Sequence, residues 1–181
     1  MNIASSEFTE LGSQMVLPLF EGVDKAPNNS LSGLSRSQRS LVKDALSSGS
    51  FDGKKGKRMT LWTPGCNIVL VGMGEKDSLG HKRARNTGAR LIASMSKKKG
   101  IDVTVRFTSG WSVERMIDFA EGMLLRDYEF LEHQESPKDH ISDPWNVSFQ
   151  ASSRYQESLS RGLSKVGSVA EGDHLARDLG N

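Results

Sequence analysis

Apolar residues recur along this chain with two different periods, and the two periods alternate after Met59. Residues 68–71 are continuously apolar and end at a glycine, which predicts a strand covered on both faces. In residues 101–107 every second position is apolar, which predicts a strand with one buried face. Residues 58–64 also alternate, and Pro64-Gly65 ends them with a turn, so a neighbouring strand is expected there.

Two further segments are weaker candidates for strands. Residues 14–20 are apolar but contain Pro18, which cannot donate to a ladder and is expected at a sheet edge or a bulge. The stretch "WNVSF" at residues 145–149 is a candidate for one more strand.

Four segments carry apolar residues at helical spacing. Residues 35–49 begin with serine caps, place Leu41 in an apolar stripe and stop at Gly49. Residues 79–99 and the segment from Val113, with Ser112 as its N-cap, show the same period. A last helix is expected from about Ser153 to Leu179. Its apolar positions are Leu159, Leu163, Val166, Ala170 and Ala176. Its glycines each lower helix propensity by about 1 kcal/mol relative to alanine, so it needs a packing partner.

From Met59 the order is therefore strand, strand, helix, strand, helix, which predicts an α/β domain. Residues 133–146 are polar, contain two prolines and are expected to form a loop. The single cysteine, Cys66, excludes an internal disulfide framework and fits a reducing cytosol. The sequence has neither a signal-peptide pattern at its start nor a run long and apolar enough for a membrane span. A soluble intracellular protein is expected.

The net charge of +2 is unevenly distributed. Residues 36–58 and 82–99 form two basic blocks, whereas residues 114–143 are acidic. Such asymmetry is typical of nucleic-acid surfaces, and solvated helix faces produce the same pattern.

A turn that resembles a phosphate-binding loop follows the apolar strand. "VGMGEKDSLGHK" lies between a strand and a helix, but Asp77 stands where a dinucleotide fingerprint has its third glycine. The Gly-Lys-Ser/Thr of a Walker loop is also missing, and Glu75 and Asp77 would repel a phosphate. A tight strand-to-helix turn is the simpler interpretation.

No other motif indicates a catalytic or metal site. The histidines His81, His133, His140 and His174 have no partner at metal-ligand spacing. Cys66 follows "TPG" in a predicted turn, outside any nucleophile motif. Asp118 and Glu121 are three residues apart, which a solvated helix face explains.

Three short stretches resemble leucyl (cytosol) aminopeptidases, peptidase family M17, in order and spacing. They are "VLVGMG" at residues 69–74, "FAEGMLLRDYEF" at 119–130 and "AEGDHLARDLGN" at 170–181. The family's linker helix reads Ala-Arg-Asp-Leu-x-Asn, which this chain matches with Ala176, Arg177, Asp178, Leu179 and Asn181. The resemblance covers most of the chain from about Met59.

The resemblance implies a macro-domain-like α/β domain over residues 1–152, with a mixed sheet between helices. Residues 153–181 would be a linker helix that leads to a catalytic domain outside this sequence, so the chain is expected to end within a longer protein. In the family that other domain holds two divalent metals, Mn or Zn, in motifs such as Asn-Thr-Asp-Ala-Glu-Gly-Arg. The similar string "NTGAR" at residues 86–90 lacks both carboxylates. No catalytic, cofactor-binding or metal-binding residue is therefore assigned to this chain.

The function implied is that of a non-catalytic amino-terminal domain. The parent enzyme would be a cytoplasmic hexamer that removes amino-terminal residues from peptides, and this domain would serve assembly and limit access to the active sites. Its partners would be the catalytic domain of the same polypeptide and further copies of the protein. The alternative is a stand-alone macro-like module that binds DNA through the basic blocks, or an ADP-ribose-type ligand near the turn at residues 72–77.

Overall fold

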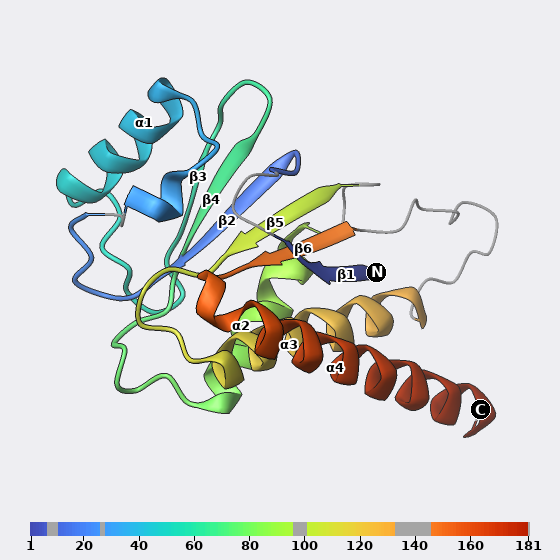
Figure 1. Ribbon diagram of the computed structural model, residues 1–181. Coiled ribbons are helices and arrows are strands. Elements are labelled where there is room, and N and C mark those ends of the chain that lie inside the picture. Colours follow the sequence, from blue (N-terminus) through green and yellow to red (C-terminus); the bar gives the residue numbers. More distant parts are fainter. Residues whose placement is uncertain (7–10, 26–27, 96–100, 133–145, 181) are drawn as a thin grey trace.

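The protein is built around one six-stranded sheet, seen in the computed structural model of Figure 1, which describes residues 1–6, 11–25, 28–95, 101–132 and 146–180. The strands lie in the order β1-β6-β5-β2-β4-β3. All neighbours are parallel except β3 and β4, which are antiparallel. The predicted α/β fold with a mixed sheet is confirmed. The strand bounds are β1 Asn2–Ser5, β2 Gln14–Leu19, β3 Arg58–Leu61, β4 Asn67–Gly72, β5 Asp102–Arg106 and β6 Asn146–Gln150.

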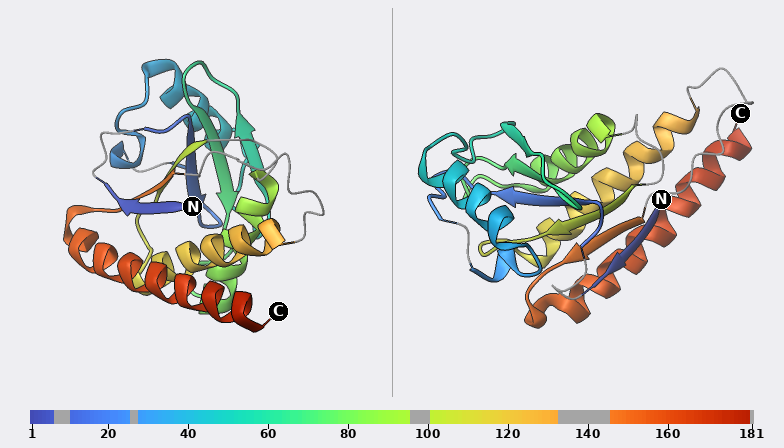
Figure 2. Two further views of the ribbon diagram at one scale, coloured as in Figure 1. Left: turned by 90° about the vertical axis from the view of Figure 1, so that its right-hand side faces the viewer. Right: turned by 90° about the horizontal axis from the view of Figure 1, so that it is seen from above.

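Helices cover both faces of the sheet, as Figures 1 and 2 show. One face carries the short 3-10 helix η1 (Asn28–Leu31) and α1 (Arg36–Ser47). The opposite face carries α2 (His81–Met95), α3 (Val113–Glu132) and α4 (Ser153–Gly180). Within the described ranges, no helix combines the length and the apolarity that crossing a bilayer requires.

The continuous apolar run of β4 serves two cores. Ile68 and Leu70 pack with α1, whereas Val69 and Val71 pack into the larger core under α2 and α3. Successive side chains of a strand point to opposite faces, so a strand between two helical layers needs apolar residues at every position. The prediction made from residues 68–71 is confirmed.

The position expected for Pro18 was wrong, because β2 lies in the middle of the sheet between β4 and β5. Leu19 accepts a hydrogen bond from Met73 on the β4 side, so the neighbouring Pro18 faces the β5 side. Pairing with β5 ends at Val16, and the Pro18 carbonyl accepts a hydrogen bond from Trp111 Nε1 at 3.3 Å. The missing N–H of proline therefore breaks no ladder bond.

Helix α1 begins and ends as its sequence predicts, but one residue of its stripe is misplaced. Ser35 Oγ accepts a hydrogen bond from the Gln38 backbone, Gln38 bonds back to Ser35, and Gly49 follows the helix at φ +72°. Leu41 was expected in the apolar stripe, yet its exposed fraction is 43%. The helix rests on the sheet through Gln38, Val42, Ala45 and Leu46, and Leu41 lies beyond the edge of that contact.

The other helices also agree with the pattern. The Ser112 hydroxyl accepts a hydrogen bond from the Arg115 backbone at the start of α3. In α4, Leu159 and Leu163 are buried as expected, whereas the side chains of Ala170 and Ala176 lie outside the described residues. The loop expected at residues 133–146 falls almost entirely outside the described residues, and Asn146 already belongs to β6. The division into two units at residue 153 stays a prediction.

Helices α2 and α3 cross with their backbones in close contact, because each presents a glycine to the other. A Cβ atom added at Gly122 would lie 2.7 Å from the carbonyl carbon of Arg85 and closer still to its oxygen. A Cβ atom added at Gly88 would meet the Phe119 carbonyl in the same way. This crossing fixes α2 relative to α3, and with it the groove described below.

Candidate functional site

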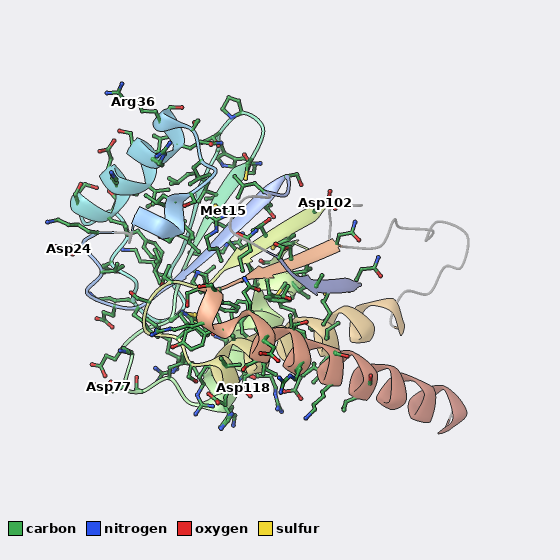
Figure 3. The ribbon with its side chains drawn as sticks, viewed as in Figure 1. Met15, Asp24, Arg36, Asp77, Asp102 and Asp118 are labelled. Carbon is green, nitrogen blue, oxygen red and sulfur yellow. The ribbon has the colours of Figure 1, made fainter. Side chains whose placement is uncertain are left out.

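The turn that resembles a phosphate loop is held by protein contacts. The Gly74 N–H donates to the Gly53 carbonyl at 2.9 Å, and the Gly74 carbonyl accepts from Glu21 N–H at 2.9 Å. Glu75 and Asp77 are exposed in the same turn, where Figure 3 labels Asp77. Backbone groups used in this way are not available to a phosphate. The interpretation as a tight strand-to-helix turn therefore fits the geometry.

Asp118 differs from the expectation of a solvated helix face, because it is buried, whereas Glu121 remains partly exposed. The Asp118 carboxylate lies 2.7 Å from His81 Nδ1 and 3.0 Å from the Arg115 guanidinium, and its residue is buried. Glu121 pairs with Arg85 at 2.6 Å. Since His81 and Arg85 belong to α2, these contacts join the two helices beside their crossing.

The remaining candidates are dispersed. His133 and His140 lie outside the described residues, as does the side chain of His174. In the part of the chain that the structure describes, no group of three or more histidines, cysteines and carboxylates could hold a metal ion. Cys66 is buried, and its thiol lies 3.7 Å from the Asn67 carbonyl. Burial raises the pKa of the Cys66 thiol, which leaves less of the nucleophilic thiolate at neutral pH.

One cavity of about 620 Å³ gathers residues from both basic blocks, and we call it the basic groove. Its first wall is formed by Lys55 and Lys57 of the loop that enters β3 and by Arg58, the first residue of that strand. Its second wall is one side of α2, beginning at Ser78 and Gly80. The α2 residues of that wall are Lys82, Arg83, Asn86, Thr87 and Arg90. Val71 and Leu91 also line the cavity. The string "NTGAR" thus contributes to the groove, while its Gly88 serves the helix crossing.

The groove is strongly cationic. Six of its lining residues are lysines or arginines, and none is an aspartate or glutamate. Asp52, just outside, pairs with Lys57 at 3.2 Å and with Lys54 at 3.5 Å. Among the described residues, no carboxylate lies within 4.0 Å of the other five cationic side chains that line the cavity. These are Lys55, Arg58, Lys82, Arg83 and Arg90.

Two of these arginines, one on each wall, are held by serines that both lie on the α2 side. Arg83 donates to Ser78 Oγ at 2.6 Å, and the Ser78 hydroxyl in turn donates to the Glu75 carbonyl. Arg58 donates to Ser94 Oγ. Both guanidinium groups are therefore oriented without the loss of their charge.

The first turn of α2 places its charges against the helix dipole. It begins His81-Lys82-Arg83 and contains no acidic residue. Helix N-termini carry a partial positive charge, so cations there are unfavourable and anions are favoured.

The sequence alone could not identify the groove. Its two walls are separated along the chain by β4, and each wall lies in a basic block that a solvated surface would also explain.

A buried arginine is a second feature that the sequence pattern missed. Arg106, at the end of β5, is fully buried. It donates to Gln150 Oε1 at 2.7 Å and to the carbonyls of Ser30 and Ser32 at 3.3 and 2.6 Å. Desolvation lowers the pKa of Arg106 to about 10, so it remains protonated at neutral pH. It ties the segment around η1 to the ends of β5 and β6.

The fold and the site define a single-sheet α/β domain with a cationic groove and, in its described part, no metal cluster. Comparison with known proteins gives the family. Residues 16–137 match the model described as "Cytosol aminopeptidase family, N-terminal domain". The chain belongs to this family and corresponds to its N-terminal domain.

Individual relatives agree with that assignment. A probable cytosol aminopeptidase of Nitrosococcus oceani is 24% identical over 163 residues, covering 82% of this chain and 32% of the relative. One from Burkholderia orbicola is 24% identical over 159 residues, covering 79% and 30%. The chain thus spans about a third of the length of the curated relatives it matches.

Solved structures share the fold. A tomato leucine aminopeptidase mutant superposes with a TM-score of 0.71 at 22% identity, covering 99% of this chain and 38% of that one. The bottromycin maturation enzyme BotP in complex with Mn gives a TM-score of 0.55 at 16% identity, covering 93% and 32%.

Proposed function

We propose that this chain is the non-catalytic N-terminal domain of a leucyl aminopeptidase that removes amino-terminal residues from peptides. The observation that carries the proposal is the match over residues 16–137 to the N-terminal domain of the family. The extent of the fold likeness supports it, because nearly all of this chain superposes on little more than a third of tomato leucine aminopeptidase.

In this proposal the chemistry belongs to a second domain that follows the linker helix at residues 153–181. Two divalent metals, Mn or Zn, would be held there and would activate a water for attack on the peptide carbonyl. The present chain would supply none of the metal ligands. Its contribution would be to position α4, which packs through Leu159 and Leu163 on the core of this domain and leads toward the second one.

An assay with a leucine anilide and added Mn²⁺ or Zn²⁺ tests the non-catalytic part of the proposal. The purified chain is expected to give no turnover above the metal alone. Metal-dependent turnover that follows the protein through a final purification step would contradict the proposal.

We further propose that the domain serves assembly and access control in a cytoplasmic hexamer. Light scattering would compare the full-length enzyme with a form that lacks residues 1–152. Turnover of a leucine anilide and of a long peptide would be measured on both. Removal of the domain is expected to favour the long peptide relative to the anilide, or to break the hexamer. An unchanged hexamer with an unchanged substrate ratio would contradict this role.

The second candidate is a stand-alone binding module, and the basic groove is the observation that favours it. For DNA, the two basic blocks would contact phosphates, so binding should weaken steeply as salt rises. A gel shift insensitive to salt would remove this candidate. An ADP-ribose-type ligand at residues 72–77 is less favoured, since the backbone of Gly74 is already hydrogen bonded within the protein. Calorimetry with ADP-ribose tests it, and an absence of heat would remove it.

A further inference from the structure

We propose that the basic groove binds an oligophosphate, meaning two or more linked phosphates, either free or carried by a nucleotide. This inference does not depend on the aminopeptidase proposal, because the groove belongs wholly to the present chain.

Most of the positive charge on the two walls of the groove has no carboxylate partner among the described residues. Lys55 comes from the loop before β3, Arg58 begins β3, and Lys82, Arg83 and Arg90 come from α2. Like charges that converge on one cavity repel each other, and Asp52, which precedes the first wall in the sequence, already pairs with Lys54 and Lys57. An anion in the groove would relieve this repulsion from both sides.

The start of α2 breaks a local sequence rule. Acidic residues stabilise the first turn of a helix, yet α2 begins with His81, Lys82 and Arg83. His81 has a carboxylate partner in Asp118 of α3, whereas no described carboxylate lies within 4.0 Å of Lys82 or Arg83. Violations of local rules that the structure does not compensate are typical of functional sites. A bound phosphate would reverse the conflict, because helix N-termini and cations both favour it.

Two arginines of the groove are oriented by hydrogen bonds to serines. Ser78 holds the Arg83 guanidinium on the α2 wall, and Ser94 of α2 holds the guanidinium of Arg58, which extends from β3. A guanidinium binds phosphate oxygens through paired donors in a fixed plane, so an oriented arginine loses less freedom on binding. The groove therefore offers prepared donors on both walls as well as a positive field.

The volume of the groove also favours a ligand with more than one phosphate. A cavity of about 620 Å³ lies within the usual range for small-molecule sites, roughly 300 to 1,000 Å³. That volume exceeds the needs of one orthophosphate. The cations also surround one cavity, whereas nucleic-acid surfaces carry them as an extended patch or stripe. An oligophosphate fits both features.

Calorimetric titration of the whole chain tests the proposal with three probes, namely inorganic tripolyphosphate, ATP without metal, and orthophosphate. Tripolyphosphate and ATP are expected to bind at one site, and orthophosphate at least about tenfold more weakly because it contacts fewer cations. Equal binding of tripolyphosphate and ATP would identify the phosphate chain as the recognised group. Tighter binding of ATP would identify a nucleotide as its source.

A pair of charge-matched variants distinguishes the groove from general attraction. Lys82→Glu with Arg90→Glu alters the groove, and Arg36→Glu with Lys43→Glu alters α1 on the opposite face of the sheet. Figure 3 labels Arg36 on α1, far from Asp118 in the α2–α3 layer. Each pair replaces two exposed cations and changes the net charge from +2 to −2. Each also places a glutamate in the first turn of a helix, so neither should unfold the protein.

The groove variant is expected to lose at least about tenfold in affinity for tripolyphosphate, and the α1 variant less than about twofold. Thermal unfolding should show that both variants remain folded. Equal losses in the two variants would overturn the proposal and leave only a net-charge effect. An absence of binding to the wild-type chain at millimolar tripolyphosphate would overturn it as well. Binding of duplex DNA without binding of any oligophosphate would replace it with a nucleic-acid surface.

Discussion

Replacing Gly122 by alanine tests the account of how α2 and α3 are held together. The added Cβ atom would meet the Arg85 carbonyl, which is backbone and cannot rotate away, so the helices must separate. Overpacking of this kind costs about 1 to 3 kcal/mol, and the upper end applies because backbone meets backbone. Alanine gains about 1 kcal/mol in helix propensity over glycine. The net expectation is destabilisation by about 2 kcal/mol.

Two other glycines of the helical layer provide controls with the same chemical change. At Gly167 an added Cβ meets nothing within 4 Å, so Gly167→Ala should stabilise the protein by up to about 1 kcal/mol. At Gly162 it would meet the side chain of Ile117, which can turn aside, so Gly162→Ala should fall between the other two. Because the gain in propensity is common to all three variants, their differences report the clash alone.

Urea unfolding followed by circular dichroism is the assay for this series. With a slope of roughly 2 kcal/mol per molar urea, Gly122→Ala should lower the midpoint by about 1 M, and Gly167→Ala should raise it slightly. If Gly122→Ala were as stable as Gly167→Ala, the close crossing of α2 and α3 would be wrong, and the position of the groove wall with it.

Three further predictions concern single side chains. Arg106→Met should destabilise the protein by about 2 to 4 kcal/mol in urea unfolding, because Gln150 and two backbone carbonyls lose a buried hydrogen-bond donor. A change below about 1 kcal/mol would contradict the stabilising role of Arg106. Iodoacetamide at pH 8 should modify Cys66 at least about tenfold more slowly in the folded than in the unfolded chain, because the thiol is buried and its pKa is raised. Equal rates of modification would refute the burial of this thiol. The pKa of Asp52 is lowered in the folded protein, chiefly by the hydrogen bond from the Lys54 backbone. The stability that Asp52 contributes is therefore present above the pKa of the unfolded chain and is lost as the pH falls through the pKa of the folded protein. Asp52→Asn should lose less stability than the wild type between about pH 5 and pH 2, and parallel curves of stability against pH would contradict this. The same variant releases Lys57 and should bind tripolyphosphate slightly more tightly, whereas weaker binding would count against the groove.

The sequence was most informative where local rules decide the outcome. The apolar run of β4 required cover on both faces, and the capping box of Ser35 and Gln38 set the start of α1. The strand β1 went unrecognised, because four residues of mixed polarity become a strand only through pairing with β6. Pro18 was misplaced for a related reason, since its tolerance depends on where the β5 ladder ends.

The site was less predictable than the fold because it depends on residues distant in sequence. Lys55 and Lys82 belong to separate basic blocks, and their shared cavity arises only when α2 packs beside the hairpin of β3 and β4. Arg106 lies between the buried Val105 and Phe107 in the alternating pattern, a position that is typical of the exposed face of a strand. In the structure the segment around η1 covers this position and buries Arg106. The sequence likewise predicts a solvated Asp118, because only the packing of α2 on α3 brings His81 against its carboxylate.

The most direct test of the central claim is the coding sequence that follows the codon for Asn181. If the chain is the N-terminal domain of an aminopeptidase, the reading frame should continue into a longer second domain that contains the lysine and carboxylates of a two-metal site. A stop codon directly after Asn181 would contradict that account, and the basic groove would then become the main indication of what this protein does.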